Sequence, residues 1–253
     1  ESDGDASPEH VSGWYGEHGY DFLALTDHNH LTLIKEASNN QNRWPLLIPG
    51  EEVTSRLFDI KIPIHVNGIG ISHVIDAAHE DSIVKTLQEN VNRIRNSGGL
   101  ASINHPNYKW AFGDKEISQV SGTWAMEVHN GHPASNNLGG GGKPSTESMW
   151  DRVLSAGTRL FGIATDDSHH YTDEFSFDRS NPGRGWVVVK SDALDQDSLM
   201  KAMSAGEFYA STGVVLGELS ISPSELVIEL DPRTDEKLTT VFYGKHGREL
   251  WRS

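Results

Sequence analysis

The sequence predicts an α/β protein built as a closed or nearly closed barrel, with a small β extension at the C-terminal end. Short apolar strand-like runs alternate with amphipathic helix-like segments through the first four-fifths of the 253 residues. Six or more such units suit a barrel of parallel strands covered by helices. After Phe208-Tyr209 the helical pattern stops. An open, doubly wound sheet is the structural alternative.

The first half of the chain alternates helices and strands. Ser7 is a typical N-cap residue and Pro8 suits the first helical position, so we expect a helix that stops at Gly19. A second amphipathic helix is expected from about Asp81 to Asn96, before Gly98-Gly99. The apolar run 21–26 predicts a short, fully buried strand, and further strands are expected at 46–48, 62–71 and 100–103.

The second half continues the alternation and then loses its helices. Strands are expected at 125–128, 160–164 and 186–189, with helices around 149–154, closed by Gly157, and 199–205. The runs 216–221, 226–230 and 238–243 are β-like without helices between them. We therefore expect a barrel domain over residues 1–208 and a β extension over residues 209–253.

Composition excludes several classes of function. The net charge of −15 disfavours a nucleic-acid backbone or an anionic membrane as partner, so an anionic small-molecule substrate would need a local positive charge. The absence of cysteine excludes disulfide scaffolds, zinc ribbons and thiol catalysis, and leaves the cellular compartment undetermined. No apolar run is long enough to predict a transmembrane helix, and the first residues do not resemble a signal peptide.

Imidazoles and carboxylates follow one predicted strand after another. In a parallel barrel all strand C-termini open on one face, so these groups are expected to converge. Neutral imidazole with carboxylate suits Zn, Mn or Fe, and the set is too large for one tetrahedral ion, so two or three divalent ions are expected. His30, His132 and His170 adjoin better candidates and are left open. The strand-end groups are Asp27-His28, Glu51-Glu52, His65, Asn104-His105, His129 and Asp166-Asp167-Ser168-His169.

Taken in their order along the chain, these strand-end motifs resemble those of the PHP (polymerase and histidinol phosphatase) superfamily of metal-dependent hydrolases. The later segments Glu127-Val128-His129-Asn130-Gly131, Arg184-Gly185-Trp186 and 206–213 resemble its carbaryl-hydrolase-like (CehA/McbA-type) branch. The segments that carry the superfamily resemblance are Ser2-Asp3-Gly4, 19–29, Pro49-Gly50-Glu51-Glu52, Ile64-His65-Val66, Asn104-His105-Pro106 and Asp167-Ser168-His169.

The resemblance implies a distorted (β/α)7 barrel whose mouth holds two or three metal ions. The family's first motif, His-x-His at the end of the first strand, precedes Ser2-Asp3-Gly4, so we expect that strand and its two ligands upstream of Glu1. Glu52 is favoured over Glu51 because the family's acidic ligand sits two residues after the glycine. The implied ligands are Asp3, His28 and His169 for one ion and Glu52, His65 and His105 for another, with Glu52 bridging to a further ion shared with Asp167.

The implied ligand set predicts that the protein is a metal-dependent hydrolase. A hydroxide bridging the ions is the expected nucleophile, and the substrate is expected to be a phosphoester, or a carbamate or carboxylic ester. His129 is expected to orient the substrate or protonate the leaving group, and Arg184 to bind a phosphate or carboxylate; structural roles for both are the alternatives. The rival function is a non-catalytic metal-binding or carbohydrate-contacting module. A polymerase-associated proofreading module is disfavoured by the chain length and the acidic surface.

Overall fold

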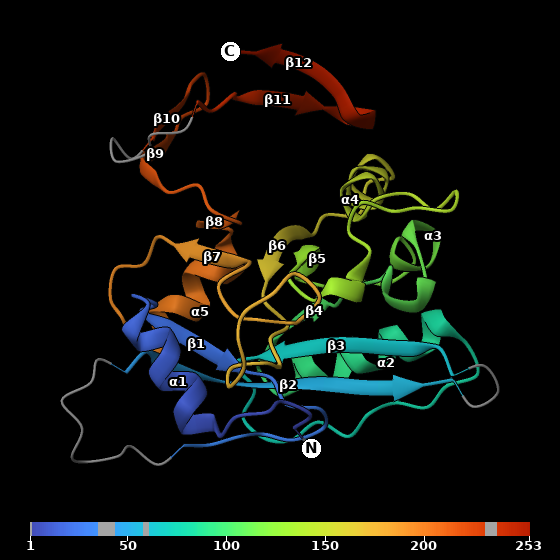
Figure 1. The fold of residues 1–253 in the computed structure, drawn as a ribbon. Coiled ribbons are helices and arrows are strands. Elements are labelled where there is room, and N and C mark those ends of the chain that lie inside the picture. Colours follow the sequence, from blue (N-terminus) through green and yellow to red (C-terminus); the bar gives the residue numbers. More distant parts are fainter. Residues whose placement is uncertain (1, 35–43, 58–60, 231–236) are drawn as a thin grey trace.

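A curled six-stranded sheet forms the centre of the protein (Figure 1). The computed structural model describes residues 2–34, 44–57, 61–230 and 237–253. All six strands run parallel except β3, which is antiparallel to both of its neighbours. In sheet order, which is also chain order, the strands are β1 (Phe22–Leu25), β2 (Leu46–Arg56), β3 (Pro63–Ile69), β4 (Leu100–Ile103), β5 (Ala125–Asn130) and β6 (Phe161–Thr165).

This strand order decides between the two predicted architectures. Mainly parallel strands that follow one another in chain order are typical of a barrel, whereas a doubly wound sheet reverses its order at a switch point. The α/β class is confirmed, and the sheet is curled as a barrel requires. The count of seven β/α units stays a prediction, because the main sheet contains six strands within the described ranges.

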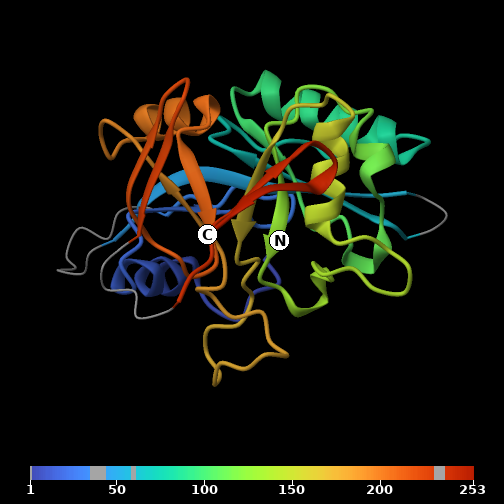
Figure 2. The same cartoon turned by 90° about the horizontal axis from the view of Figure 1, so that it is seen from above.

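The helices begin where the sequence predicts them. Ser7 caps α1 (Pro8–Glu17) by accepting the His10 N–H, and Ser82 caps α2 (Ile83–Asn96) in the same way. Seen from above, α1 and α2 lie on opposite sides of the molecule (Figure 2). The other helical segments are η1 (Tyr108–Trp110), α3 (Asp114–Ile117), η2 (Pro133–Ser135), α4 (Thr146–Ser155), α5 (Gln196–Ala205) and η3 (Lys245–Gly247).

The core lies between α2 and the middle of the sheet. Leu87, Val91 and Ile94 repeat at helical spacing along α2, and all three are fully buried. They belong to one apolar cluster with Val66 of β3 and Ile103 of β4. Burial of this stripe fixes the strands whose ends carry the candidate ligands.

β1 differs from its prediction as a fully buried strand. All four of its residues are partly exposed, because β1 is at the edge of the sheet and lines a large cavity. An apolar run predicts a strand without predicting its place in the sheet.

The C-terminal part consists of two-stranded units. β7 (Trp186–Val189) pairs with β8 (Phe208–Ser211), so the predicted boundary between residues 208 and 209 falls within a paired strand. The β-like runs of the C-terminal part form two antiparallel hairpins that stand away from the main sheet (Figure 1). No helix within the described ranges is long and apolar enough to cross a membrane. The hairpin strands are β9 (Leu216–Ile221) with β10 (Leu226–Leu230), and β11 (Val241–Gly244) with β12 (Arg248–Arg252).

Candidate metal centre

A buried carboxylate, that of Glu52, is surrounded by three imidazoles. His65 Nδ1 lies 2.8 Å from Glu52 Oε1 and His28 Nδ1 lies 2.9 Å from Oε2. His105 Nε2 is 3.3 Å from Oε1, which also accepts a hydrogen bond of 2.9 Å from Asn104 Nδ2. The cluster therefore brings together residues from the ends or middles of four different strands.

Backbone pairing beyond the end of β1 brings His28 beside Glu52. The Asn29 N–H donates to the Glu52 carbonyl at 3.0 Å, and the Glu52 N–H donates to the Asp27 carbonyl at 3.1 Å. The chain after β1 thus continues along β2 for a few residues. Glu51, next to Glu52, faces the other side of the sheet, where its Oε2 accepts the Ile75 N–H at 2.8 Å. This alternation follows from the two-residue period of a strand.

His65 reaches the cluster because β3 runs against the other strands. It is the third residue of β3, near the start of that strand, and it pairs with Thr54 of β2. An antiparallel strand places its first residues beside the last residues of its neighbours. The prediction of His65 at the carboxyl end of a parallel strand was therefore wrong about the strand direction.

A second group of candidate ligands lies next to the first. Asp3 contacts two imidazoles, with Oδ1 3.1 Å from His169 Nε2 and Oδ2 3.7 Å from His28 Nε2. Asp167 Oδ2 lies 4.0 Å from His105 Nε2. The seven predicted metal ligands thus form one continuous chain of contacts around Glu52.

Two side chains that the sequence analysis did not assign extend the array. The His105 ring contacts the Tyr108 ring at 5.2 Å between centroids, Tyr108 contacts His132 at 5.9 Å, and His132 contacts His169 at 5.6 Å. The contacts from His28 through these rings and back through Asp3 close into a loop. The sequence does not distinguish His132 as a site residue, and only its position in space places it in the array.

The buried acidic and basic groups of the cluster shift one another's pKa values. Burial alone would raise the pKa of Glu52, but His65, His105 and His28 around the carboxylate hold it well below its ordinary value. Burial alone would lower the pKa of His105, but Glu52, Glu127 and Asp167 raise it to about 9. Burial raises the pKa of Glu127 to about 7.

The donor set fits a divalent cation. One nitrogen from each of His28 and His65 and one oxygen of Glu52 lie within 4.8 Å of one another. Among the described residues, the buried Nδ1 of His65 makes no well-aligned hydrogen bond, although it is close to the Glu52 carboxylate. Imidazole and carboxylate together suit Zn, Mn or Fe.

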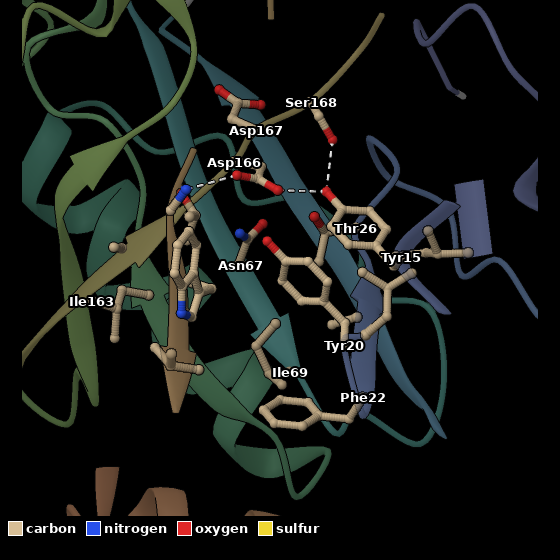
Figure 3. Close-up of a pocket in the computed structure, with 18 of the residues that line it drawn as sticks. Tyr15, Tyr20, Phe22, Thr26, Asn67, Ile69, Ile163, Asp166, Asp167 and Ser168 are labelled. Atoms are coloured by element: carbon tan, nitrogen blue, oxygen red, sulfur yellow. Dashed lines mark hydrogen bonds between the residues drawn. The ribbon is translucent and has the colours of Figure 1, made fainter. Parts of the chain in front are cut away.

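A cavity of about 1010 Å³ opens at the candidate ligands. Its polar end carries Asp166, Asp167 and Ser168, and its other end is apolar, with Phe22 and Ile69 (Figure 3). The cavity runs along the free edge of β1 and is also lined by β6 and β7. A ligand in this space can therefore contact the candidate metal ligands with one end and apolar side chains with the other.

Asp166 anchors the segment that carries Asp167 and His169. One of its carboxylate oxygens accepts the Tyr15 hydroxyl at 2.7 Å (Figure 3). The carboxylate also accepts the backbone N–H groups of residues 183, 184 and 185. Gly131 packs against the same segment, since a Cβ there would lie 2.7 Å from the Asp166 carbonyl oxygen. This part of the site tolerates little displacement.

His129 and Arg184 lie outside the cluster. Arg184 donates to the carbonyls of Gly131 and Ser176 and does not line the cavity. The His129 ring packs beside Gly185, and burial lowers its pKa. Its buried Nε2 has no hydrogen-bond partner in the part of the chain that the structure describes. A β-bulge at Val128 explains the position of His129, because an extra residue in β5 turns the following side chains to the opposite face.

The comparisons with known proteins concern the fold. The structure is similar to a crystal structure from Bacteroides vulgatus ATCC 8482, of a two-domain protein containing a predicted PHP-like metal-dependent phosphoesterase. The TM-score is 0.55 at 18% sequence identity, and the match covers 87% of this chain and 69% of that chain. The likeness supports a PHP-like fold. No protein-family model matches the sequence, and no curated protein matches it.

Proposed function

We propose that the chain is a metal-dependent phosphoesterase. The observation that carries the proposal is the buried Glu52 carboxylate among His28, His65 and His105, open to a large cavity. The phosphoesterase description of the structurally similar protein supports the same class of reaction. Carbamate and carboxylic ester hydrolysis is the second candidate, favoured by the resemblance of Glu127-Val128-His129-Asn130-Gly131 to the CehA/McbA-type branch.

The candidate ligands divide into two sets, one of which contains Glu52. His65 and His105 with Glu52 would hold one divalent ion, and Asp3, His28 and His169 would hold another. Glu52 would also contribute to a third position, together with Asp167. When bound, such ions act as Lewis acids on a phosphoryl or carbonyl oxygen and generate a nucleophile from water near neutral pH. We propose Zn, Mn or Fe, in two or three equivalents. The positive charge would offset the net charge of −15 for an anionic substrate.

His132 presents a hydrogen-bond donor beside the candidate ligands. Its Nδ1 accepts the Ala134 N–H at 3.1 Å, so the neutral ring carries its proton on Nε2. Burial lowers its pKa, which favours the neutral form at pH 7. Its ring contacts that of His169, at the polar end of the cavity. We propose that this Nε2–H donates a hydrogen bond to the bound substrate and orients it, in place of the role expected for His129.

The test is a substrate panel with the full chain, loaded with Mn, Zn or Fe and freed of excess metal. The panel contains p-nitrophenyl phosphate, bis(p-nitrophenyl) phosphate, p-nitrophenyl acetate and an aryl carbamate. We expect metal-dependent release of p-nitrophenol from a phosphoester. His105→Ala and Asp167→Ala should abolish turnover with nearly unchanged circular dichroism, because each removes a ligand to the ions.

The matched control is His73→Ala, an exposed histidine whose only described hydrogen bond is to Ser72. It should leave turnover unchanged. Elemental analysis that finds no bound metal after loading, or full turnover in both ligand variants, would refute the proposal. Faster cleavage of the carbamate or acetate would assign the reaction to the second candidate.

A further inference from the structure

Glu127 is a carboxylate in the floor of the candidate site to which the sequence analysis gave no role. Its side chain is 1% exposed. Oε2 accepts the His105 backbone N–H at 2.7 Å and Asn130 Nδ2 at 2.8 Å, and Oε1 accepts the Thr165 hydroxyl at 2.7 Å. One carboxylate therefore connects the ends of β4, β5 and β6.

Asn130 extends this connection to a candidate ligand. Its Nδ2 donates to Asp167 Oδ2 at 3.1 Å as well as to Glu127. In a regular strand residues 127 and 130 would face opposite sides, because their separation is odd. The bulge at Val128 inserts one unpaired residue between them, so both side chains reach the same face. The bulge thus creates the link from Glu127 to Asp167.

His105 and Asp167 both have an unfavourable backbone conformation that contacts with other residues must stabilise. His105 has φ 20° and Asp167 has φ 48°, in the left-handed region that side chains with a Cβ rarely adopt. Such conformations persist only where surrounding contacts hold them. Glu127 binds the N–H of the first, and Asn130 binds the side chain of the second.

We propose that Glu127, acting through Asn130, is a positioning residue of the metal centre. It orients His105 and Asp167 and makes no bond to the metal itself. The proposal rests on the proposed function, since it requires that His105 and Asp167 bind a metal. Groups that orient metal ligands typically change metal affinity by about 10–100-fold when they are removed.

A matched residue separates this role from a purely structural one. Glu51 is also a fully buried carboxylate, but it faces away from the cluster and its described hydrogen bond is to the Ile75 N–H. Glu127→Gln and Glu51→Gln each remove one buried carboxylate without changing its shape. Both variants should lose stability if burial alone matters, whereas only Glu127→Gln should affect the metal.

The experiment measures Zn²⁺ or Mn²⁺ binding to the metal-free full chain by competition with a chromophoric chelator. We expect Glu127→Gln to weaken binding by about 10–100-fold with the same number of ions bound, and Glu51→Gln to leave the affinity within about threefold. Equal affinities in the two variants would overturn the proposal. Loss of a whole equivalent of metal would also overturn it, because Glu127 would then be a ligand.

A second pair keeps the test valid if Glu127→Gln does not fold. Thr165→Val removes one donor to Glu127 at nearly constant volume, and it should weaken metal binding in the same direction. Its control is Thr86→Val, because the Thr86 hydroxyl is buried on α2 and makes no hydrogen bond to any described residue. Unchanged affinity in Thr165→Val overturns the proposal. Absence of metal binding in the unmodified chain refutes the proposed function instead.

Discussion

The contact between Tyr15 and Asp166 ties α1 to the segment that carries two candidate ligands, and its removal is the most direct test of that anchor. Tyr15→Phe deletes one hydroxyl and leaves the ring in place. The hydroxyl donates to Asp166 at 2.7 Å and lies 3.0 Å from the Ser168 hydroxyl, and the residue is 5% exposed. Burial and the nearby Asp166 raise the pKa of Tyr15 well above its ordinary value, so it is a donor throughout the working pH range.

The expected loss follows from these contacts. A hydrogen bond to a charged group contributes about 1.5–3 kcal/mol, and the Asp166 carboxylate keeps its three backbone donors, so we expect a loss of about 2 kcal/mol. For a domain of this size that loss corresponds to a fall in Tm of about 4–8 °C. The control is Tyr20→Phe, because Tyr20 lies beside Tyr15 at 4.8 Å between centroids (Figure 3) and the structure describes no hydrogen bond from its hydroxyl.

Urea denaturation of the metal-free chain, followed by tryptophan fluorescence, measures both variants. Tyr20→Phe should stay within about 0.5 kcal/mol of the unmodified chain, as expected where no buried hydrogen bond is lost. A Tyr15→Phe variant equal in stability to Tyr20→Phe would show that the anchor contributes nothing, and the explanation given for the placement of Asp167 would then be wrong.

Two further predictions concern the metal and the packing of the site. In the chelator-treated chain, the pKa of His105 is about 9 in the folded state, against 6.5 for an ordinary histidine. The contribution of His105 to the stability of the fold is therefore complete below pH 6.5 and is lost as the pH rises to 9. Added Zn²⁺ should reverse this pH trend in the Tm, since metal binding requires neutral imidazole and strengthens as the pH rises. Plots of Tm against pH that run parallel with and without Zn²⁺ would contradict this prediction. Gly131→Ala should weaken metal binding, because the added Cβ would displace residue 166. The control is Gly13→Ala, which lies in open space on α1 and should raise stability by about 0.5–1 kcal/mol. Calorimetry of both variants checks this pair, and unchanged metal affinity in Gly131→Ala would show that the segment can move.

Much of the fold is predictable from the sequence because it depends on local signals. Ser7 and Ser82 mark helix starts by their capping chemistry, and the apolar stripe of α2 marks the buried face. Strand position is less predictable, because an apolar run such as Phe22–Leu25 looks the same at an edge as in the middle of a sheet.

All the candidate ligands except Asp3 are predictable because each follows or lies within an apolar run, which is a property of the sequence alone. Asp3 comes only from the family resemblance of Ser2-Asp3-Gly4. The supporting residues were missed for a physical reason. Tyr108 and His132 join the cluster through turns after β4 and β5, and no periodic pattern predicts the direction of a turn side chain. Glu127 has no role that the sequence predicts, because a carboxylate on a strand gives no signal of the three donors that it meets.

The site depends on three departures from a regular parallel sheet, and each one moves a particular side chain. The reversed direction of β3 brings His65 to the open end, and the left-handed backbone at Asp167 turns its carboxylate toward Asn130. The bulge in β5 has the largest effect, because it directs Asn130 inward and His129 away. The two-residue period of a regular strand over 127–130 would instead direct His129 inward and Asn130 away. Such irregularities arise from pairing with a neighbouring strand, so the sequence of one strand predicts the residue types of this site better than the faces on which they lie.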